Sequence, residues 1–265
     1  MQKLPMVSLL VFCFLFQLVS SNNVCEHCVH RTKATYFKKS AQYSSDACGY
    51  GTMASRISNG NLAAGAPSLV KDGAGCGACF QIRCKDSNLC SVDGAKVMLT
   101  DVAKDNQTGF VLSSNAFMSL AKKDKVSTIF DKRIVDVEYR RIPCQYNRNM
   151  ALRVEETSRR PNNLAVQVLY QGGQTEIVGM DVAAVGSSNW IYMSRIHGAV
   201  WNTTRAPSGA LQFRFVVTSG FDGKWVWAKH VLPQNWTPGT IYSTGLQIND
   251  TALSGCYPCD AAKWQ

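Results

Sequence analysis

The sequence predicts a mainly β protein made of two domains. Its 265 residues fit one or two domains. Short apolar segments separated by Gly-rich turns fill both halves, which is the pattern of β-strands. Eight cysteines lie from Cys25 to Cys144, and none lies between Cys144 and Cys256. We therefore expect a disulfide-stapled first domain and a second domain held by its core alone, with the boundary between Pro143 and Asn163.

The N-terminal segment is typical of a secretory signal peptide. Lys3 precedes the apolar run LLVFCFLFQLV, and small polar residues follow it. We expect residues 1–21 to be removed, which leaves an even ten cysteines in a secreted, extracellular protein without a membrane anchor. Four sequons are candidate glycosylation sites in such a glycoprotein: Asn106, Asn202, Asn235 and Asn249.

The first domain reads as a small mixed barrel or an α+β unit. Strands are predicted for the segments CFQIRC (79–84), AKVMLTD (95–101) and RIVDVEYRRI (133–142). Ser113 or Ser114 can cap one helix, on which Ala116 and Phe117 begin an apolar repeat at helical spacing. A basic stretch, KKDK, ends this helical pattern.

The second domain reads as strands only, in the manner of a β-sandwich. The strand segments are LAVQVLY (164–170), TEIVGMDVA (175–183), ALQFRFVVT (210–218) and KWVWAKHV (224–231). Trp225 and Trp227 share one face of their strand, and we expect both in the core. We expect at least one of Trp190, Tyr192 and Trp201 to be exposed, where a flat ring can stack on a sugar.

The basic charge is concentrated in the first half of the chain. Residues 22–148 hold 18 Lys and Arg against 11 Asp and Glu, a net +7, whereas residues 149–265 hold 9 against 7, a net +2. In a secreted protein, this positive charge either favours solubility or attracts an acidic matrix such as pectin or anionic membranes. Nucleic acid is not an expected partner.

Motifs for metal, nucleophilic or phosphate chemistry are weak. CEHC, CGAC and CYPC have the spacing of zinc ligands, but an oxidising compartment favours disulfides, so we expect no metal. The four histidines form no recognisable triad, and GAGCGAC lacks the Lys-Ser/Thr ending of a phosphate loop. We expect no cofactor.

One carboxylate, Asp101, ends a predicted strand and could stand at the rim of a glycan-cleaving cleft. The usual glycoside hydrolysis needs a second carboxylate roughly 5–9.5 Å away. Asp46 could approach from another loop, whereas Asp105 lies beside the Asn106 sequon. For Asp101 alone, an Asx-type turn and a functional role both stay open.

Several motifs in order resemble plant expansins, most closely the expansin-like A branch. They are KATYF, ACGYG, GAGCGACFQIRC, VMLTD, FVLSSNAF, VEYRRIPC, YMSRIHGAVW and VLPQNW. The resemblance implies a six-stranded double-psi β-barrel like that of family 45 glycoside hydrolases (residues 41–147). It further implies an immunoglobulin-like, cellulose-binding-type β-sandwich (161–247), which a C-terminal tail (248–265) follows.

The resemblance also implies three disulfides in the barrel. The expected pairs are Cys48 with Cys76, Cys79 with Cys144, and Cys84 with Cys90. Four further cysteines lie outside this framework and pair either within each Cys-x-x-Cys or between the two ends of the chain: Cys25, Cys28, Cys256 and Cys259.

Matched to the family, the expected polysaccharide contacts are Thr35, Tyr36 and Asp101 in the barrel groove, and Trp190, Tyr192 and Trp201 in the sandwich. Two departures remove carboxylates. Val111 stands where most expansins have a second aspartate, and Lys38 replaces the hydrolase base if TYFK aligns with it. We therefore expect no catalytic residues and no enzyme activity.

The expected function is that of a secreted, monomeric cell-wall protein that binds cellulose, xyloglucan or pectin. It would loosen or organise the plant-type cell wall without hydrolysis. One alternative is a structural or signalling wall protein without loosening activity. The other is a weak glycan hydrolase or lytic transglycosylase that uses Asp101 as its acid but lacks a base.

Overall fold

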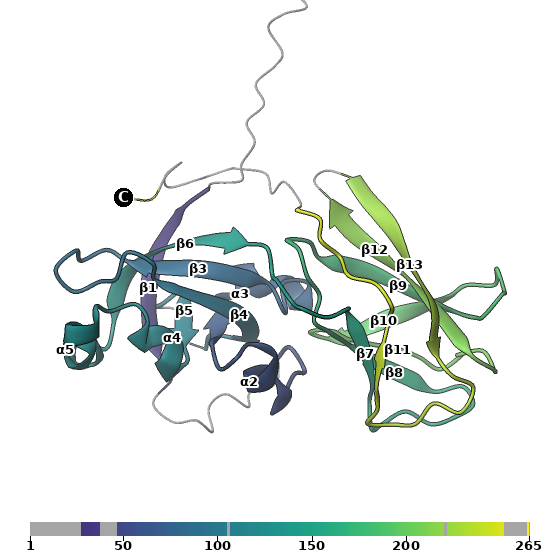
Figure 1. The fold of residues 1–265 in the computed structure, drawn as a ribbon. Coiled ribbons are helices and arrows are strands. Elements are labelled where there is room, and N and C mark those ends of the chain that lie inside the picture. Colours follow the sequence, from purple (N-terminus) through teal and green to yellow (C-terminus); the bar gives the residue numbers. More distant parts are fainter. Residues whose placement is uncertain (1–27, 38–46, 105–106, 220–221, 252–263, 265) are drawn as a thin grey trace, which may run out of the picture.

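The computed structural model describes residues 28–37, 47–104, 107–219, 222–251 and 264. These residues form a β-barrel followed by a second β-sheet, which lie side by side in Figure 1. The expected signal peptide, Lys38, Asp46 and Asn106 lie outside the described residues, as do Cys25, Cys256 and Cys259.

The barrel is closed by six strands in the order β1-β5-β2-β4-β3-β6. The pairs β1–β5 and β2–β4 are parallel, and the others are antiparallel. Fully buried side chains such as Phe110, Leu112 and Ile82 belong to its core. The strands are β1 (His30–Tyr36), β2 (Leu62–Gly65), β3 (Cys79–Cys84), β4 (Ala95–Val102), β5 (Phe110–Leu112) and β6 (Val135–Ile142).

Short helices cover the barrel. Ser113 is the helix cap, because its hydroxyl oxygen accepts a hydrogen bond from the Ala116 backbone N–H at 3.3 Å. The basic stretch KKDK leads into a further helix after α4. The helical elements are α2 (Met53–Ile57), α3 (Pro67–Val70), η2 (Lys71–Gly73), α4 (Ser114–Met118), η3 (Lys123–Lys125) and α5 (Val126–Lys132).

Three disulfides staple the barrel. They are Cys48–Cys76, Cys79–Cys144 and Cys84–Cys90, with Cα–Cα distances of 5.4, 5.3 and 5.5 Å, and they are the pairings expected from the resemblance. The two cysteines of CGAC therefore go to different partners. Cys28 is also in a disulfide, and its partner lies outside the described residues.

The second sheet has eight strands in the order β13-β12-β9-β10-β11-β8-β7-β14. Its two layers share β10, which pairs with β9 along its first half and with β11 along its second. The end strands β13 and β14 lie in contact. The strands are β7 (Ala151–Val154), β8 (Leu164–Leu169), β9 (Ile177–Ala184), β10 (Ile191–His197), β11 (Val200–Thr203), β12 (Leu211–Ser219), β13 (Asp222–Leu232) and β14 (Ile241–Ser243).

The domain limits differ from the expected ones at their N-terminal ends. Strand β1 belongs to the barrel although it precedes residue 41, and β7 belongs to the second sheet although it precedes residue 161. Both strands are the first of their domain in sequence. Strand β1 pairs with β5 and β6, and β7 pairs with β8 and β14.

The two domains meet backbone against backbone at two glycines with positive φ. A Cβ on Gly198 would lie 2.3 Å from the Cys48 Cα, and a Cβ on Gly73 would lie 2.7 Å from the Gly198 nitrogen. The Arg195 guanidinium donates to the Gly73, Gly198 and Ile177 carbonyls. These contacts hold the barrel and the second sheet together.

An ion cluster reinforces the same interface. Glu176 accepts from Lys71 Nζ and from Arg141 Nη1 at 2.8 Å each. Burial opposes the charged carboxylate, but Arg141 and Lys71 outweigh it, and the pKa of Glu176 is lowered from its ordinary value of 4.5. The carboxylate therefore stays charged and joins the second sheet to the barrel.

We expect Glu176→Gln to lower the free energy of unfolding at about pH 7 by roughly 1–2 kcal/mol, because two cations lose their partner but Lys71 is half exposed. The lowered pKa means that this stabilisation is complete above pH 4.5 and is lost as the pH falls through the folded-state pKa. Urea unfolding at about pH 7 and pH 3 measures the difference.

The matched control is Glu156→Gln, because the Glu156 side chain is 70% exposed. It should have little effect at either pH. A difference between wild type and Glu176→Gln that is equally large at about pH 3 and pH 7 would contradict the ion-cluster account.

Candidate functional site

Two of the residues expected in a barrel groove, Thr35 and Asp101, belong to one row across four neighbouring strands. Thr35 on β1 pairs with Val111 on β5, which pairs with Ala64 on β2, which pairs with Asp101 on β4. The neighbouring Phe110 is fully buried in the core, so this row lies on the other face of β5. Three strand spacings separate Thr35 from Asp101, or roughly 14 Å along the sheet.

Neither polar end of this row is fully offered to solvent. Asp101 is only 4% exposed, and its Oδ1 accepts from the Val102 backbone N–H at 2.8 Å. The Thr35 hydroxyl donates to the Arg133 carbonyl at 2.8 Å. The expectation that Asp101 stands exposed at a cleft rim is therefore wrong. A shift of register between Leu99 and Asp101 places its side chain in the row.

Tyr36 does not join this row. Successive residues of a strand point to opposite faces, and Tyr36 follows Thr35. Its ring lies 4.8 Å from the rings of both Phe117 and Phe130, as a half-buried edge of the core. The structure thus places Thr35 and Asp101 at the two ends of one row, with Val111 and the buried Ala64 between them.

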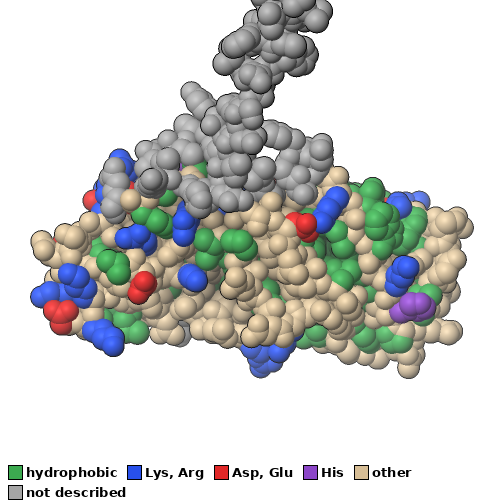
Figure 2. Space-filling model, turned by 45° about the horizontal axis from the view of Figure 1, so that its top comes forward, with side chains coloured by type: hydrophobic (Ala, Val, Ile, Leu, Met, Phe, Trp, Pro, Cys, Tyr) green, Lys and Arg blue, Asp and Glu red, His purple; other side chains and the backbone are tan. Residues whose placement is uncertain are grey.

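The second sheet carries a different surface, which we call the aromatic face and define by Trp190, Tyr192, Arg214, Trp225 and Trp227. Its central row runs from Trp227 on β13 through Arg214 on β12 and Asp181 on β9 to Tyr192 on β10. Trp225, Trp227 and Tyr192 are 41%, 50% and 60% exposed. Figure 2 shows hydrophobic side chains gathered over the second domain.

Arg214 fixes the aromatic face. Its guanidinium carbon lies 4.2 Å from the centre of the Trp225 ring and 4.6 Å from that of Trp190. Asp181 accepts from Arg214 Nε at 2.7 Å and is itself buried. The ring centres of Trp225 and Trp227 are 6.3 Å apart. A held cation between indoles keeps these rings in place as a preformed stacking surface.

The sequence predictions for these aromatic residues have mixed outcomes. Tyr192 is exposed, as expected for at least one of its group, and Trp190 is half buried. Trp201 is 1% exposed, so its expected role as a sugar contact is wrong. It pairs with the fully buried Val166, and the Arg195 guanidinium lies 4.2 Å from its ring.

The core prediction for Trp225 and Trp227 is also wrong. Pairing between β13 and β12 sets Val226 opposite Phe215 and Ala228 opposite Phe213. Since both phenylalanines are fully buried, the smaller residues of β13 face the core and the two tryptophans face outward. In the sequence, Trp225 and Trp227 alternate with the smaller Val226 and Ala228. This alternation would have predicted outward tryptophans if Ala228 had been taken as a core residue.

The candidate glycosylation sites within the described residues lie at or near the surface. Asn235 and Asn249 are exposed, and Asn202 is half buried. In the described part of the chain, no group of three or more His, Cys, Asp or Glu side chains could hold a metal ion. No described helix is long and apolar enough to cross a membrane.

Comparison with family models covers both domains. A model described as the expansin C-terminal domain matches residues 150–233, and one described as lytic transglycolase matches residues 62–139. The first spans the second sheet up to the end of β13, including the aromatic face. The second spans most of the barrel.

Similar proteins extend over nearly the whole chain. Expansin-like A1 of Arabidopsis thaliana is 56% identical over 262 residues, which cover 97% of this chain and 97% of that protein. Expansin-like A3 of Oryza sativa subsp. japonica is 50% identical over 211 residues, covering 79% and 76%.

Solved structures share the fold. The apo expansin of Clavibacter michiganensis aligns with a TM-score of 0.64 at 20% identity, covering 83% of this chain and 97% of that one. A mutant of that expansin, solved in complex with cellohexaose, aligns with a TM-score of 0.62 at 19% identity and the same coverage. At these identities, the likeness shows the arrangement of the barrel and second sheet.

Proposed function

The chain belongs to the plant expansin family and is most like its expansin-like A members, and from this membership we propose that it is a secreted cell-wall protein that binds wall polysaccharide without cutting it. The aromatic face carries this proposal. Its exposed rings can stack on the apolar faces of a sugar chain, and Arg214 and Tyr192 offer hydrogen bonds beside them.

The face suits an extended, uncharged chain such as a β-glucan. The row from Trp227 to Tyr192 crosses four strands, or roughly 14 Å, so it can contact several sugar units at once. Its single cation is already paired with Asp181. Binding by this face therefore rests on ring stacking rather than on net charge.

The barrel row supports holding a chain rather than hydrolysing it. Val111 occupies the position between Thr35 and Ala64, and Asp101 is buried. Hydrolysis by the usual route needs an acid and a base or nucleophile flanking the bond. A row with one buried carboxylate and an apolar side chain beside it offers no such pair.

A sedimentation assay with insoluble cellulose, xyloglucan-coated cellulose and a pectin gel tests the proposal. We expect binding to cellulose to persist at about 1 M salt, because the Debye length is then near 3 Å and only charge attraction is screened. Binding to pectin should weaken under the same conditions. Loss of cellulose binding at high salt would show that the basic charge, and not the aromatic face, holds the chain.

We further propose that this binding loosens contacts between wall polymers. A stacked glucan chain can be drawn away from its neighbours by binding energy alone, with no covalent bond broken. Extension of isolated walls under constant load tests this step. Binding without wall extension would show that the protein is a structural wall protein. This is the second candidate function, and the buried Asp101 and the apolar Val111 favour it.

A further inference from the structure

A separate hollow lies on the barrel, on strands β4, β3 and β6. Its volume is about 490 Å³, within the usual range for small-molecule sites. Two rows of paired residues make its floor, one polar and one largely apolar. The polar row is Lys96–Gln81–Arg140, and the apolar row is Met98–Cys79–Ile142.

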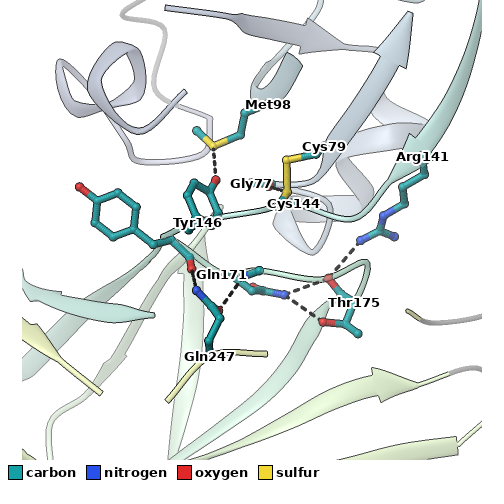
Figure 3. The surroundings of a disulfide bond; sticks show 11 residues. Gly77, Cys79, Met98, Arg141, Cys144, Tyr146, Gln171, Thr175 and Gln247 are labelled. Atoms are coloured by element: carbon teal, nitrogen blue, oxygen red, sulfur yellow. Dashed lines mark hydrogen bonds between the residues drawn. A yellow bond between two sulfur atoms is a disulfide. The ribbon is translucent and has the colours of Figure 1, made fainter. Parts of the chain in front are cut away.

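Two chain segments form the sides of this pocket. The first is residues 57–61, at and just after the end of α2, and the second is residues 143–146, where the chain leaves the barrel. The Cys79–Cys144 disulfide fastens the second segment to the floor. Tyr146 then reaches over, and its hydroxyl donates to the Met98 sulfur at 3.2 Å (Figure 3). Burial, with a smaller contribution from Tyr170, raises the pKa of Tyr146 to about 12, so this hydroxyl keeps its proton.

Arg140 is held in the pocket by two neighbours, Gln81 and Trp264. Its Nη2 donates to Gln81 Oε1 at 3.0 Å, and Gln81 Nε2 donates to the Asp93 carbonyl at 3.1 Å. The Trp264 ring centre lies 5.1 Å from the guanidinium carbon. The guanidinium is therefore oriented before any ligand arrives.

Two buried polar atoms of the pocket have no hydrogen-bond partner among the described residues. They are Arg140 Nε and Ser58 Oγ. Buried polar atoms in proteins are nearly always paired, because an unpaired one costs about 1–3 kcal/mol. Both atoms belong to residues that line the pocket, although the atoms themselves are covered by protein.

The charge of the lining selects the ligand. Lys96 and Arg140 are cationic, and no Asp or Glu is among the described residues that line the pocket. The amides of Asn59, Asn61 and Gln145 can bond hydroxyl groups on either side. The apolar row and the volume exceed what a small inorganic anion needs, whereas a sugar ring that carries a carboxylate matches the anionic, hydroxylated and apolar parts together.

We propose that this pocket binds a uronate unit of an acidic polysaccharide, with Arg140 and Lys96 at the carboxylate and the sugar ring against the half-buried Ile142 and Tyr146. This inference rests on the proposed function in one respect, namely that the ligand is part of a wall polysaccharide. The pocket lies on the barrel, apart from the aromatic face, so substitutions can remove either site without the other. Basic side chains on the barrel's surface (Figure 2) attract the same acidic chains.

Calorimetric titration of the full chain with trigalacturonate tests the site, with the fully methyl-esterified trimer as the uncharged ligand of the same shape. We expect Lys96→Gln and Arg140→Gln each to weaken binding of the acid trimer about tenfold, because a charge-assisted hydrogen bond is lost. Lys96 is exposed, so its variant should fold normally. The control Lys123→Gln removes the same charge outside the pocket and should bind like wild type.

The double variant Trp225→Ala/Trp227→Ala separates this site from the aromatic face. It should keep full affinity for trigalacturonate even where it loses cellulose. Equal affinity for the acid and esterified trimers would overturn the proposal, as would equal weakening by Lys123→Gln, which indicates diffuse charge attraction. Full competition by inorganic phosphate at equal concentration would likewise reduce the pocket to a simple anion site.

Discussion

Replacing Trp225 and Trp227 together by alanine is expected to weaken binding to cellulose about thirtyfold while lowering thermal stability only slightly. An exposed ring that stacks on a ligand contributes on the order of 1 kcal/mol, and two rings together correspond to roughly a thirtyfold change in affinity. Both side chains are at least 41% exposed, so their removal leaves no cavity.

Binding isotherms on insoluble cellulose and thermal unfolding of the same preparations measure the two effects. The matched control is Ile241→Ala, which removes a 45% exposed apolar side chain from β14 instead. It should bind like wild type. Unchanged binding by the double tryptophan variant would show that another surface holds the glucan.

Trp201→Ala is expected to act in the opposite way, by lowering the free energy of unfolding about 3–5 kcal/mol. The ring is 1% exposed, and it supports Arg195, which donates to carbonyls on both sides of the domain interface. Its removal leaves a large cavity beneath the half-buried Arg195 guanidinium. Any loss of polysaccharide binding by this variant should follow from its loss of folding.

Urea unfolding followed by circular dichroism checks this prediction, and single Trp225→Ala serves as the control on the same sheet. The control should unfold like wild type. If Trp201→Ala kept full stability but lost binding selectively, Trp201 would belong to the binding surface and its buried position would be contradicted.

Local patterns were enough to predict much of the architecture. In β12, Leu211, Phe213 and Phe215 alternate with polar residues, and all three are fully buried. The sequence predicts a cap at Ser113 or Ser114, because a hydroxyl side chain there can accept a backbone N–H near the start of the helix, and Ser113 is the one that does so. Such features depend on residues a few positions apart, so they can be read directly from the chain.

The positions of the tryptophans depend on strand pairing and could not be read in this way. Trp225 and Trp227 are exposed because the register of β13 with β12 directs Val226 and Ala228 toward the core. Trp201 is buried because it pairs with the fully buried Val166 of β8, on the face that the core covers. The sequence predicted which of these side chains share a face, but not which face the core would cover.

The barrel pocket is further still from what a sequence can reveal. Lys96, Gln81 and Arg140 become neighbours only when β3 pairs with both β4 and β6. The segment that walls them is placed by the Cys79–Cys144 disulfide, across a separation of 65 residues. The family resemblance predicted that disulfide. The cationic pocket beside it could not be predicted, because its residues come together only when the barrel closes.

Cellohexaose tests the central claim, that this chain holds polysaccharide without cutting it, most directly. The hexamer is titrated into the full protein, and the mixture is then followed for a day by mass spectrometry. We predict saturable binding and recovery of the intact hexamer throughout. Binding accompanied by steadily accumulating shorter sugars, which are lost in Asp101→Asn, would contradict the account and make the chain a hydrolase.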